Sequence, residues 1–327
     1  MQSFRAFRIH EQHAGVETLT LEQLAPGEVV IRVQWSGINY KDALAVTGKG
    51  RILRRFGLVG GVDLAGVVVS SQAPDYAAGD AVLVTGCGLS ETRDGGYAEY
   101  ARVPAEAVVR LPAGMTAREV MTIGTAGFAA ALAITQLEHN GLAPGQGPVA
   151  VTGASGGVGC LAIDMLARRG YEVVAFTRKQ QAAAFLTALG AREVLAPEAT
   201  SNRPLEAERW AGAIDNVGGA GLSQLLRGLC AQGGVAAVGL AGGAELTVSL
   251  MPFLLRGANL LGVNSAATRR GKRLDVWQRI AGDLKPRHLD RIATGVVSLD
   301  ELPQASATVL AGSHTGRTLV RIAADER

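Results

Sequence analysis

A glycine-rich segment near the middle of the chain has the residue types needed to bind a pyrophosphate. Gly153, Gly156 and Gly159 follow the apolar run 149–152 and precede an apolar helical stretch that starts at Cys160. Glycines at this spacing allow a sharp turn and a close approach of the backbone to phosphate oxygens, and the following helix supplies unpaired N–H groups. A strand, a glycine turn and a helix in this order predict a dinucleotide-binding loop.

The residues about 20 positions further along the chain indicate which dinucleotide this loop prefers. Sites specific for NAD place Asp or Glu at the end of the second strand to bind the ribose hydroxyls. This sequence has Thr177, Arg178 and Lys179 there and no acid. Arg178 and Lys179 would pair with a 2′-phosphate and Thr177 could donate a hydrogen bond, so we predict NADP(H) as the cofactor. The alternative is that both cations are solvated residues at the start of a surface helix.

The cysteines and histidines do not follow a pattern typical of a metal site. Cys87, Cys160 and Cys230 are far apart, and no Cys-x-x-Cys occurs. Of the five histidines, only His10 and His13 are close in sequence, and two ligands are too few for the three protein ligands of a catalytic zinc site. We therefore expect no metal, and we expect the three cysteines to be reduced thiols without a chemical role.

The composition excludes several classes of protein. Hydrophobic residues make up 48% of the chain and charged residues 19%, which is the opposite of a disordered composition. The net charge of +3 and the absence of a basic stripe argue against nucleic-acid binding. The sequence contains no run of about 18 or more apolar residues, the length needed to span a membrane. Its first residues lack the apolar core of a signal peptide. We expect a cytoplasmic protein.

The hydrophobic pattern predicts two kinds of structure along the chain. Short strands separated by glycine, at 29–33, 65–69 and 81–84, predict a β-rich and barrel-like first part. A helical stretch over 116–137 follows, and strands then alternate with helices, which predicts βαβ units and a parallel sheet. We expect the alternating strands at 148–152, 172–176, 213–217 and 234–238, and a last strand at 318–322 that returns to the first part.

The predicted fold class is α/β, with a GroES-like β-rich catalytic domain and a Rossmann domain with a doubly wound parallel sheet. The catalytic domain is predicted to span 1–120 and to be completed by 290–327, and the Rossmann domain to span 121–289. This order resembles the medium-chain dehydrogenase/reductase architecture, whose alcohol dehydrogenases hold a catalytic zinc. The segment expected to provide the first zinc ligand, 35–42, has no cysteine, and Gly61-Val62-Asp63 replaces the Gly-His-Glu of those enzymes.

Without a metal, the expected chemistry is hydride addition to an alkene that a carbonyl or thioester already polarises. The β-carbon then receives the hydride and the α-carbon takes a proton. The hydroxyl of Tyr40 could give that proton or orient a water, since it is a donor with a pKa near 10 in its free form. Equally, Tyr40 could contact the cofactor or substrate, or be structural.

Two basic clusters could hold the phosphates of a coenzyme A ester. The alternative is that both clusters are solvated positive faces. The first cluster consists of Lys49, Arg51, Arg54 and Arg55, and the second of Arg269, Arg270, Lys272 and Arg273.

The segment Asn39–Gly50 resembles the signature of the acryloyl-CoA reductase group, within the zinc-free, quinone oxidoreductase-like branch of the superfamily. The likeness is specific and spans essentially the whole chain. It continues through 123–128, 151–159, 210–215, 239–243, 251–253 and 316–320.

The resemblance implies an enzyme that reduces acryloyl-CoA to propionyl-CoA with NADPH, and a homodimer paired through the nucleotide-binding domains. One departure is Gly60, where the family commonly has proline, and this difference is expected to loosen a turn near the pocket. By motif position, the implied cofactor contacts are Tyr40, Ser155, Gly156, Gly157, Val158, Thr177, Arg178, Lys179, Asn216, Leu261 and Arg317.

Two other functions remain open at this point. A quinone or general enone reductase would share every cofactor residue named above. An NADPH-binding protein without turnover, acting as a redox sensor or structural partner, is the third possibility, although an intact Tyr40 segment and cofactor loop argue against it.

Overall fold

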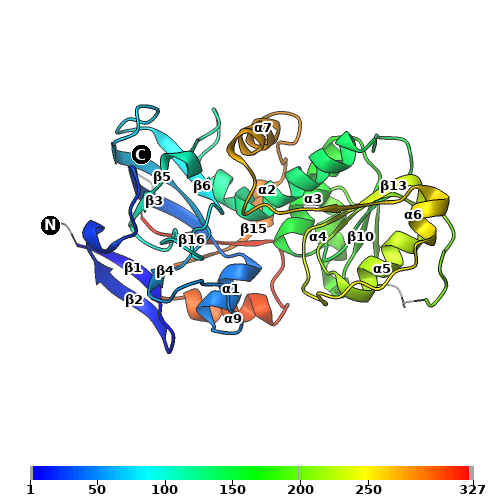
Figure 1. Ribbon diagram of the computed structural model, residues 1–327, viewed down its shortest axis with the longest axis horizontal. Helices are drawn as coiled ribbons and strands as arrows, with labels where there is room; N and C mark the ends of the chain where they lie inside the picture. The colour runs from blue at the N-terminus through cyan, green and yellow to red at the C-terminus, as the bar shows by residue number, and fades with distance from the viewer. Residues whose placement is uncertain (1–2, 198, 200, 324–327) are drawn as a thin grey trace. The chain divides into compact units, whose positions relative to one another are not determined.

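The computed structural model describes residues 3–197, 199 and 201–323, which fall into two units (Figure 1). The first unit comprises Met1–Thr125, Ala266–Asp275 and Leu289–Arg327, and the second comprises Ala126–Ser265 and Val276–His288. The segment Ala266–Asp275 lies within the range predicted for the nucleotide-binding domain, and its contacts group it with the first unit. The reason lies in the side chain of Arg273, which is 1% exposed and donates to the carbonyl oxygen of Thr85 at 2.5 Å.

A seven-stranded sheet forms the centre of the first unit. Its order is β15-β16-β3-β5-β6-β8, and β7 also pairs with β3. The final strand, β16, runs antiparallel to β3, so the end of the chain completes this sheet. The strands are β3 (Val29–Gly37), β5 (Asp63–Ser71), β6 (Ala81–Thr85), β7 (Tyr100–Val103), β8 (Val109–Arg110), β15 (Ala293–Val297) and β16 (Arg317–Arg321).

Strand β3 shows why this sheet forms where it does. Val29, Ile31 and Val33 are fully buried, while Val30 and Arg32 between them are only partly buried. Alternate side chains of a strand point to opposite faces, so this pattern places one apolar face of β3 in the core. The buried face belongs to a cluster that includes residues of β5 and β6.

A smaller sheet and three helices complete the first unit. The sheet has the order β2-β1-β4, with antiparallel pairs between β1 (Phe4–Ile9), β2 (Ala14–Leu19) and β4 (Leu58–Val59). Helix α1 packs against α9. The helices are α1 (Tyr40–Val46), α8 (Leu289–Ile292) and α9 (Leu302–Leu310), with single 3₁₀ turns at Leu21–Gln23 and Ala105–Ala107.

The second unit is a six-stranded parallel sheet with the order β11-β10-β9-β12-β13-β14. This is the strand order of a Rossmann fold, and it confirms the predicted parallel sheet. The strand order reverses between β9 and β12, where such sheets bind ligands at their carboxyl ends. The strands are β9 (Val149–Val151), β10 (Val173–Phe176), β11 (Glu193–Leu195), β12 (Trp210–Asp215), β13 (Leu229–Ala237) and β14 (Asn259–Gly262).

The helices of the second unit connect successive strands of the sheet. They are α3 (Gly157–Arg168), α4 (Ala183–Ala188), α5 (Gly219–Arg227) and α6 (Met251–Arg256), with a 3₁₀ turn at Gln180–Ala182. Two helices, α2 (Ala117–His139) and α7 (Arg270–Ala281), begin in the first unit and end in the second.

Helix α2 is the one described helix that is long and apolar enough to cross a membrane. Of its most apolar window, however, 83% is buried inside the protein, as expected of a core helix in a folded domain. Its course is broken at Gly124, whose φ of 50° and ψ of −157° are not helical. That break lies next to the polar cluster described below.

Candidate functional site

The glycine loop after β9 has the geometry of a pyrophosphate cradle. Gly153 has a φ of 57°, a conformation that glycine adopts without strain. A Cβ at Gly159 would lie 2.6 Å from the Cα of Ala154, so this position must be glycine for the helix to pack against the loop. For a Cβ at Gly156, the nearest atom would be the carbonyl oxygen of Gly153, at 3.3 Å. Gly153 is therefore favoured by its backbone conformation and Gly159 by close packing.

The N-terminus of α3 is open to an anion. Gly156 is the N-cap residue, and as glycine it has no side chain with which to cap the helix. The first N–H groups of a helix lack partners within the helix, and they attract negative charge. Ser155, Gly156, Gly157 and Val158, all predicted cofactor contacts, form this end of the helix.

The loop after β10 is tied to the glycine loop by a pair of hydroxyls. Thr177 is 4% exposed, and its Oγ1 lies 3.1 Å from Ser155 Oγ. The same Oγ1 accepts a hydrogen bond from the backbone N–H of Lys179 at 3.1 Å. Arg178 is exposed, Lys179 is half-buried, and burial lowers the pKa of the Lys179 ammonium. Two cations thus lie in the loop where a 2′-phosphate would bind, and no carboxylate is in this segment.

At the end of β12, one side chain retains an unused acceptor. Asn216 donates its Nδ2 to the carbonyl oxygen of Thr152 at 2.7 Å, and its backbone N–H donates to Thr152 Oγ1 at 2.9 Å. Among the described residues, no hydrogen-bond partner meets the buried Oδ1 of Asn216. An orphaned buried acceptor at the carboxyl edge of the sheet fits a site that is completed by a ligand.

Asp215 stabilises this edge of the sheet. Its Oδ1 accepts the Thr152 hydroxyl at 2.5 Å, and its Oδ2 accepts the Gly218 N–H at 2.7 Å. Burial raises the pKa of Asp215. The carboxylate therefore joins the strand ends of β9 and β12 on either side of the switch point. Leu261, the remaining predicted contact in this unit, is partly buried on β14, where it is opposite Ala236 of β13.

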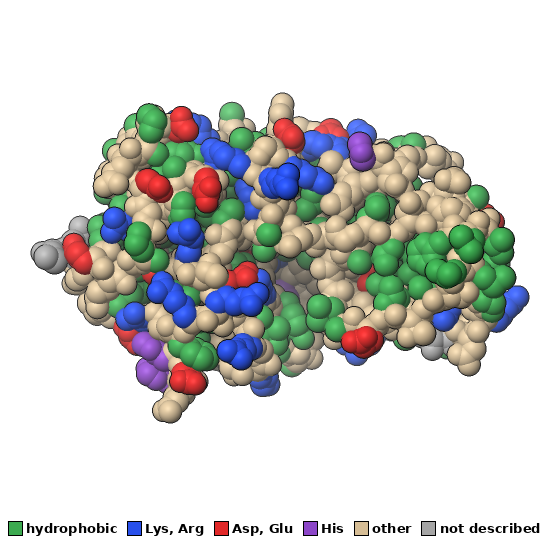
Figure 2. Space-filling model, in the orientation of Figure 1, with side chains coloured by type: hydrophobic (Ala, Val, Ile, Leu, Met, Phe, Trp, Pro, Cys, Tyr) green, Lys and Arg blue, Asp and Glu red, His purple; other side chains and the backbone are tan. Residues whose placement is uncertain are grey.

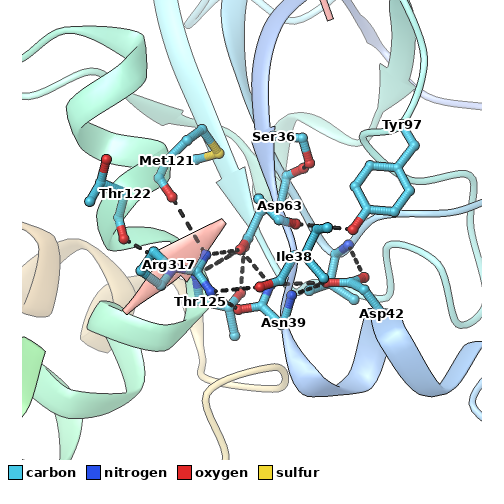
Figure 3. Close-up of polar contacts among 12 residues, drawn as sticks. Ser36, Ile38, Asn39, Asp42, Asp63, Tyr97, Met121, Thr122, Thr125 and Arg317 are labelled. Atoms are coloured by element: carbon cyan, nitrogen blue, oxygen red, sulfur yellow. Dashed lines mark hydrogen bonds and ion pairs between the residues drawn. The ribbon is translucent and has the colours of Figure 1, made fainter. Parts of the chain in front are cut away.

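In the first unit, a buried polar cluster surrounds Asp63 at the start of β5 (Figure 3). Asp63 Oδ2 accepts the side-chain amide of Asn39 at 2.8 Å. The carboxylate also accepts the backbone N–H of Thr125 at 3.0 Å and the Thr125 hydroxyl at 2.5 Å. The Nη2 of Arg317 lies 3.7 Å from Oδ2. Side chains from three other parts of the chain thus meet at this carboxylate.

Asp42 extends the cluster to the first turn of α1. Its Oδ2 accepts the backbone N–H of Asn39 at 2.9 Å, and its Oδ1 accepts the N–H of Val62 at 2.9 Å. Burial, together with the negative charge of Asp63, raises the pKa of Asp42 to about 7. Asn39 and Asp42 form a reciprocal capping box, which fixes where α1 begins.

Tyr40 is the first residue of α1, directly after this capping box. Its side chain is 46% exposed, unlike the buried Tyr97 of the same cluster, whose hydroxyl donates to the carbonyl oxygen of Gly37 at 3.1 Å. The cluster therefore holds the backbone of Tyr40 in place while its ring stays accessible. The predicted contact of Tyr40 with the cofactor stays a prediction.

Arg317 lies inside the cluster and is 2% exposed. Its Nη1 donates to the carbonyl oxygen of Ile38 at 3.0 Å and to Asn39 Oδ1 at 2.9 Å, and its Nε donates to the carbonyl oxygen of Thr122 at 3.2 Å. Cβ atoms at Gly37 and Gly124 would lie 2.7 and 2.8 Å from its Nη2, so two glycines make room for the guanidinium. The structure gives Arg317 a positioning role, and its predicted cofactor contact stays a prediction.

The turn at Gly60 is not loose, which corrects the expectation from the sequence. The Gly60 N–H donates to the carbonyl oxygen of Phe7 at 3.0 Å, and its own carbonyl oxygen accepts the N–H of Tyr97 at 2.9 Å. A Cβ at this position would lie 3.0 Å from the Tyr97 ring. Glycine here keeps a backbone hydrogen bond that proline cannot make.

Only one of the two basic clusters is available to a ligand in full. Arg273 is buried, and Arg270 donates to the carbonyl oxygens of Glu106 and Val108 at 2.8 Å each. The second cluster is therefore partly structural, and the prediction that it could hold phosphates as a unit is wrong. All four members of the first cluster, Lys49, Arg51, Arg54 and Arg55, are exposed.

The sequence reasoning missed the residues that hold the site together. Thr125, Asp215 and the carboxylates of Asp42 and Asp63 were given no role, although their side chains organise both loops. The spacing Asn39-x-x-Asp42 is a helix-start signal and could have identified Asp42 as the partner of Asn39. The others are brought together by tertiary structure alone.

Comparison with protein families assigns both halves of the chain. Residues 25–113 match the family model described as "Alcohol dehydrogenase GroES-like domain". Residues 157–281 match the model described as "Zinc-binding dehydrogenase".

Curated relatives cover nearly the full length. The chain is 45% identical over 312 residues to the acrylyl-CoA reductase AcuI of Ruegeria pomeroyi, covering 94% of each protein. It is 46% identical over 310 residues, again 94% of each, to Bacillus subtilis YhfP, which carries the name quinone oxidoreductase.

Solved structures show the same fold. The YhdH oxidoreductase of Salmonella enterica, crystallised with NADP, superposes with a TM-score of 0.94 at 42% identity, covering 98% of this chain and 100% of that one. Bacillus subtilis YhfP, crystallised with NAD, superposes with a TM-score of 0.95 at 43% identity and the same coverage. Relatives of equal similarity thus contain different dinucleotides.

Proposed function

This chain belongs to the acrylyl-CoA reductase and quinone oxidoreductase group of the medium-chain dehydrogenase/reductase superfamily, and on that premise we propose that it reduces the C=C bond of a short 2-enoyl-CoA with NADPH. The proposed reaction converts acryloyl-CoA to propionyl-CoA. The observation behind this choice is 45% identity to an acrylyl-CoA reductase along 94% of both chains. An exposed cluster of four cations, directly after α1, supports a coenzyme A ester as substrate.

The residues that would hold NADPH are present and fit it. The open N-terminus of α3 would bind the pyrophosphate, and the unused Oδ1 of Asn216 would accept a hydrogen bond from the bound cofactor. NADPH, when bound, supplies the hydride that adds to the β-carbon of the enoyl thioester. Exposed Arg178 and half-buried Lys179 would pair with the 2′-phosphate, since both are cations in the loop that follows β10.

Titration of NADPH and NADH against variants of this loop tests the cofactor choice. For Arg178→Ala, we expect KM for NADPH to rise at least tenfold and KM for NADH to stay within twofold, because one charge-assisted contact is worth about 1.5–3 kcal/mol. Arg203→Ala, which removes an exposed cation elsewhere in the same unit, serves as the matched control. Equal effects on both cofactors would contradict the proposal, as would a wild-type preference for NADH.

Tyr40 is proposed to serve the reacting end of the site, either as proton donor to the α-carbon or as a pocket wall. Its partly exposed side chain and its position directly after the capping box of α1 support either role. Tyr40→Phe separates the two. A loss of kcat of about 100-fold or more indicates proton donation, whereas a retained kcat with an altered KM indicates a contact only.

The cluster Lys49, Arg51, Arg54 and Arg55 is proposed to bind the phosphates of coenzyme A. The test compares acryloyl-CoA with the acryloyl thioester of N-acetylcysteamine, which lacks those phosphates. Arg54→Ala should raise KM for acryloyl-CoA several-fold and leave the short thioester unchanged. An unchanged KM for acryloyl-CoA after removal of all four cations would show that this face is only solvated.

A quinone or enone reductase is the second candidate, favoured by 46% identity to YhfP. Oxidation of NADPH followed separately with acryloyl-CoA, crotonyl-CoA and a simple quinone discriminates the functions. Turnover of acryloyl-CoA with little quinone activity supports the first proposal, and the reverse pattern supports the second. Tight NADPH binding without any turnover would indicate a binding protein.

We also propose a homodimer, paired through the edge of the second unit's sheet. Strand β14 is an edge strand, and exposed apolar side chains lie on and beside α6: Leu250 at 69%, Leu254 at 77% and Leu255 at 66% exposure. Figure 2 shows hydrophobic side chains gathered over the part of this unit where Figure 1 places α5 and α6. Apolar patches of this kind typically mark protein interfaces.

Light scattering on the eluting protein tests this interface. We expect the mass of two chains for the wild type and of one chain for Leu254→Glu, while Leu274→Glu, at an exposed leucine of the first unit, leaves the dimer intact.

A cytoplasmic location is proposed as well, because Cys87, Cys160 and Cys230 are all free thiols, as is usual in a reducing compartment.

A further inference from the structure

The turn between β1 and β2 brings together three side chains that can bind a metal ion. His10 directly follows the first strand and His13 directly precedes the second, and the backbone N–H of His10 donates to the carbonyl oxygen of His13 at 2.8 Å. His10 Nε2 lies 2.6 Å from Glu17 Oε1, and His13 Nε2 lies 3.9 Å from the same oxygen. Their ligand atoms all fall within 4.8 Å of one another, which among the described residues occurs in this group alone.

The strand register explains why these residues meet. Ile9 pairs with Ala14, so His10 and His13 face each other across the turn, and Glu17 lies on the same face because side chains alternate along a strand. Gly15 lies between the ligands on this face, and it has no side chain to separate them. The two imidazole rings stack, with centroids 4.5 Å apart and an interplanar angle of 19°.

Arg8 orients the carboxylate of Glu17. Its Nη1 lies 3.8 Å from Glu17 Oε2, the oxygen that does not face the imidazoles. Its Nε donates to the carbonyl oxygen of Gly57 at 2.7 Å, which anchors the guanidinium to the neighbouring segment. Partners of this kind fix the direction of a ligand in metal sites, although the positive charge of Arg8 also weakens the attraction for a cation.

We propose that His10, His13 and Glu17 form a binding site for Zn²⁺, with water as the fourth ligand. Two imidazole nitrogens and one carboxylate oxygen are a donor set that zinc prefers, at about 2.0–2.2 Å from the ion. The distances from Glu17 Oε1 to the two imidazole nitrogens, 2.6 and 3.9 Å, lie on either side of the roughly 3.3 Å that such bonds give between ligand atoms in a tetrahedron. The side chains are 29%, 69% and 33% exposed, so small rotations of all three can close the site.

This site would have a structural role rather than a role in hydride transfer. None of its residues belongs to the cluster around Asp63 or to the predicted cofactor contacts. A bound ion would cross-link both strands of the hairpin at its turn, and β1 is the central strand of its three-stranded sheet. In the sequence, His10 and His13 alone are too few for a zinc site, and the fold adds Glu17 as the third ligand.

Metal titration of the full-length protein, freed of any purification tag and of metal by a chelator, tests this site. Competition with a chromophoric zinc indicator should show one equivalent of Zn²⁺ bound per chain. We expect at least tenfold weaker binding for His13→Ala and for Glu17→Gln, and unchanged binding for His139→Ala, which removes an exposed histidine elsewhere. Circular dichroism establishes that each variant is folded.

Substitution of Co²⁺ for Zn²⁺ provides a second readout that does not depend on activity. Four-coordinate Co²⁺ should give an intense visible absorption band in the wild type and in His139→Ala, and this band should be lost in His13→Ala. The proposal is overturned if the wild type binds no Zn²⁺, or if binding and the Co²⁺ band are the same in the wild type and in His13→Ala.

Discussion

Replacing Arg317 by methionine distinguishes a positioning residue from a cofactor contact. Methionine fills a similar volume but removes the charge and every donor, and it leaves the buried carboxylate of Asp63 without its cation. Breaking a buried ion pair by removing one partner costs about 3–5 kcal/mol. We therefore expect the free energy of unfolding to fall by about that amount.

The assay is urea unfolding followed by circular dichroism, with hydrogen–deuterium exchange to locate the loss. Exchange should accelerate in β3 and β16 of the first unit and stay unchanged in the sheet of the second. Arg321→Met, at an exposed arginine on the same strand, is the matched control and should cost about 0–1 kcal/mol.

A double-mutant cycle with Asp63→Asn measures the coupling directly. Since each single variant leaves its partner buried and unpaired, the double variant should lose less stability than the sum of the two. The reasoning is refuted if Arg317→Met unfolds like the wild type and instead raises KM for NADPH. That result would assign the guanidinium to the cofactor, as the sequence resemblance implies.

Three further substitutions probe the two loops and the carboxylate pair. The pKa of Asp42, about 7 when folded, lies above its unfolded value of about 3.9, so the stability from its protonated form is complete below about pH 4 and is lost as the pH rises through 7. The Asp42→Asn variant has no carboxyl to ionise at this position. In urea titrations, its loss of unfolding free energy relative to the wild type should therefore shrink by up to about 4 kcal/mol between pH 4 and pH 8. Parallel plots of unfolding free energy against pH for the two proteins would contradict this. Gly159→Ala places a Cβ 2.6 Å from the Ala154 Cα, so calorimetry should show at least tenfold weaker NADPH binding and a stability loss of about 1–3 kcal/mol. Gly60→Pro removes the N–H bond to Phe7, and its melting temperature should fall by the equivalent of about 1–3 kcal/mol; an unchanged value would show that the turn tolerates the family's proline.

Elements with a strong periodic pattern were predictable from the sequence. The helix expected at 116–137 is α2 (Ala117–His139), and the strand expected at 172–176 is β10 (Val173–Phe176). These segments are long or fully buried, so their hydrophobic pattern reflects the core directly. The glycine loop was predictable as well, because its chemistry depends on neighbouring residues in the sequence.

Features that depend on distant residues were not predictable. Edge strands such as β2 and β14 are partly exposed, so their hydrophobic pattern is weak. In the cluster around Asp63, hydrogen-bonded residues are far apart in the sequence. Asp63 and Thr125 are separated by 62 positions, and Asn39 and Arg317 by 278. A buried carboxylate has no sequence signature, since its partners are fixed only by the fold.

The late position of β16 has a consequence for synthesis of the protein. Because this strand contains residues 317–321 and pairs with β3, the sheet of the first unit lacks one of its members until residue 321 has been synthesised. Folding on the ribosome usually proceeds from the N-terminal domain onward. Here we expect the Rossmann sheet, whose strands all precede residue 263, to assemble before the sheet of the first unit is complete. A ribosome stalled near residue 300 should therefore present a chain whose nucleotide-binding sheet resists protease and whose first 110 residues are cleaved.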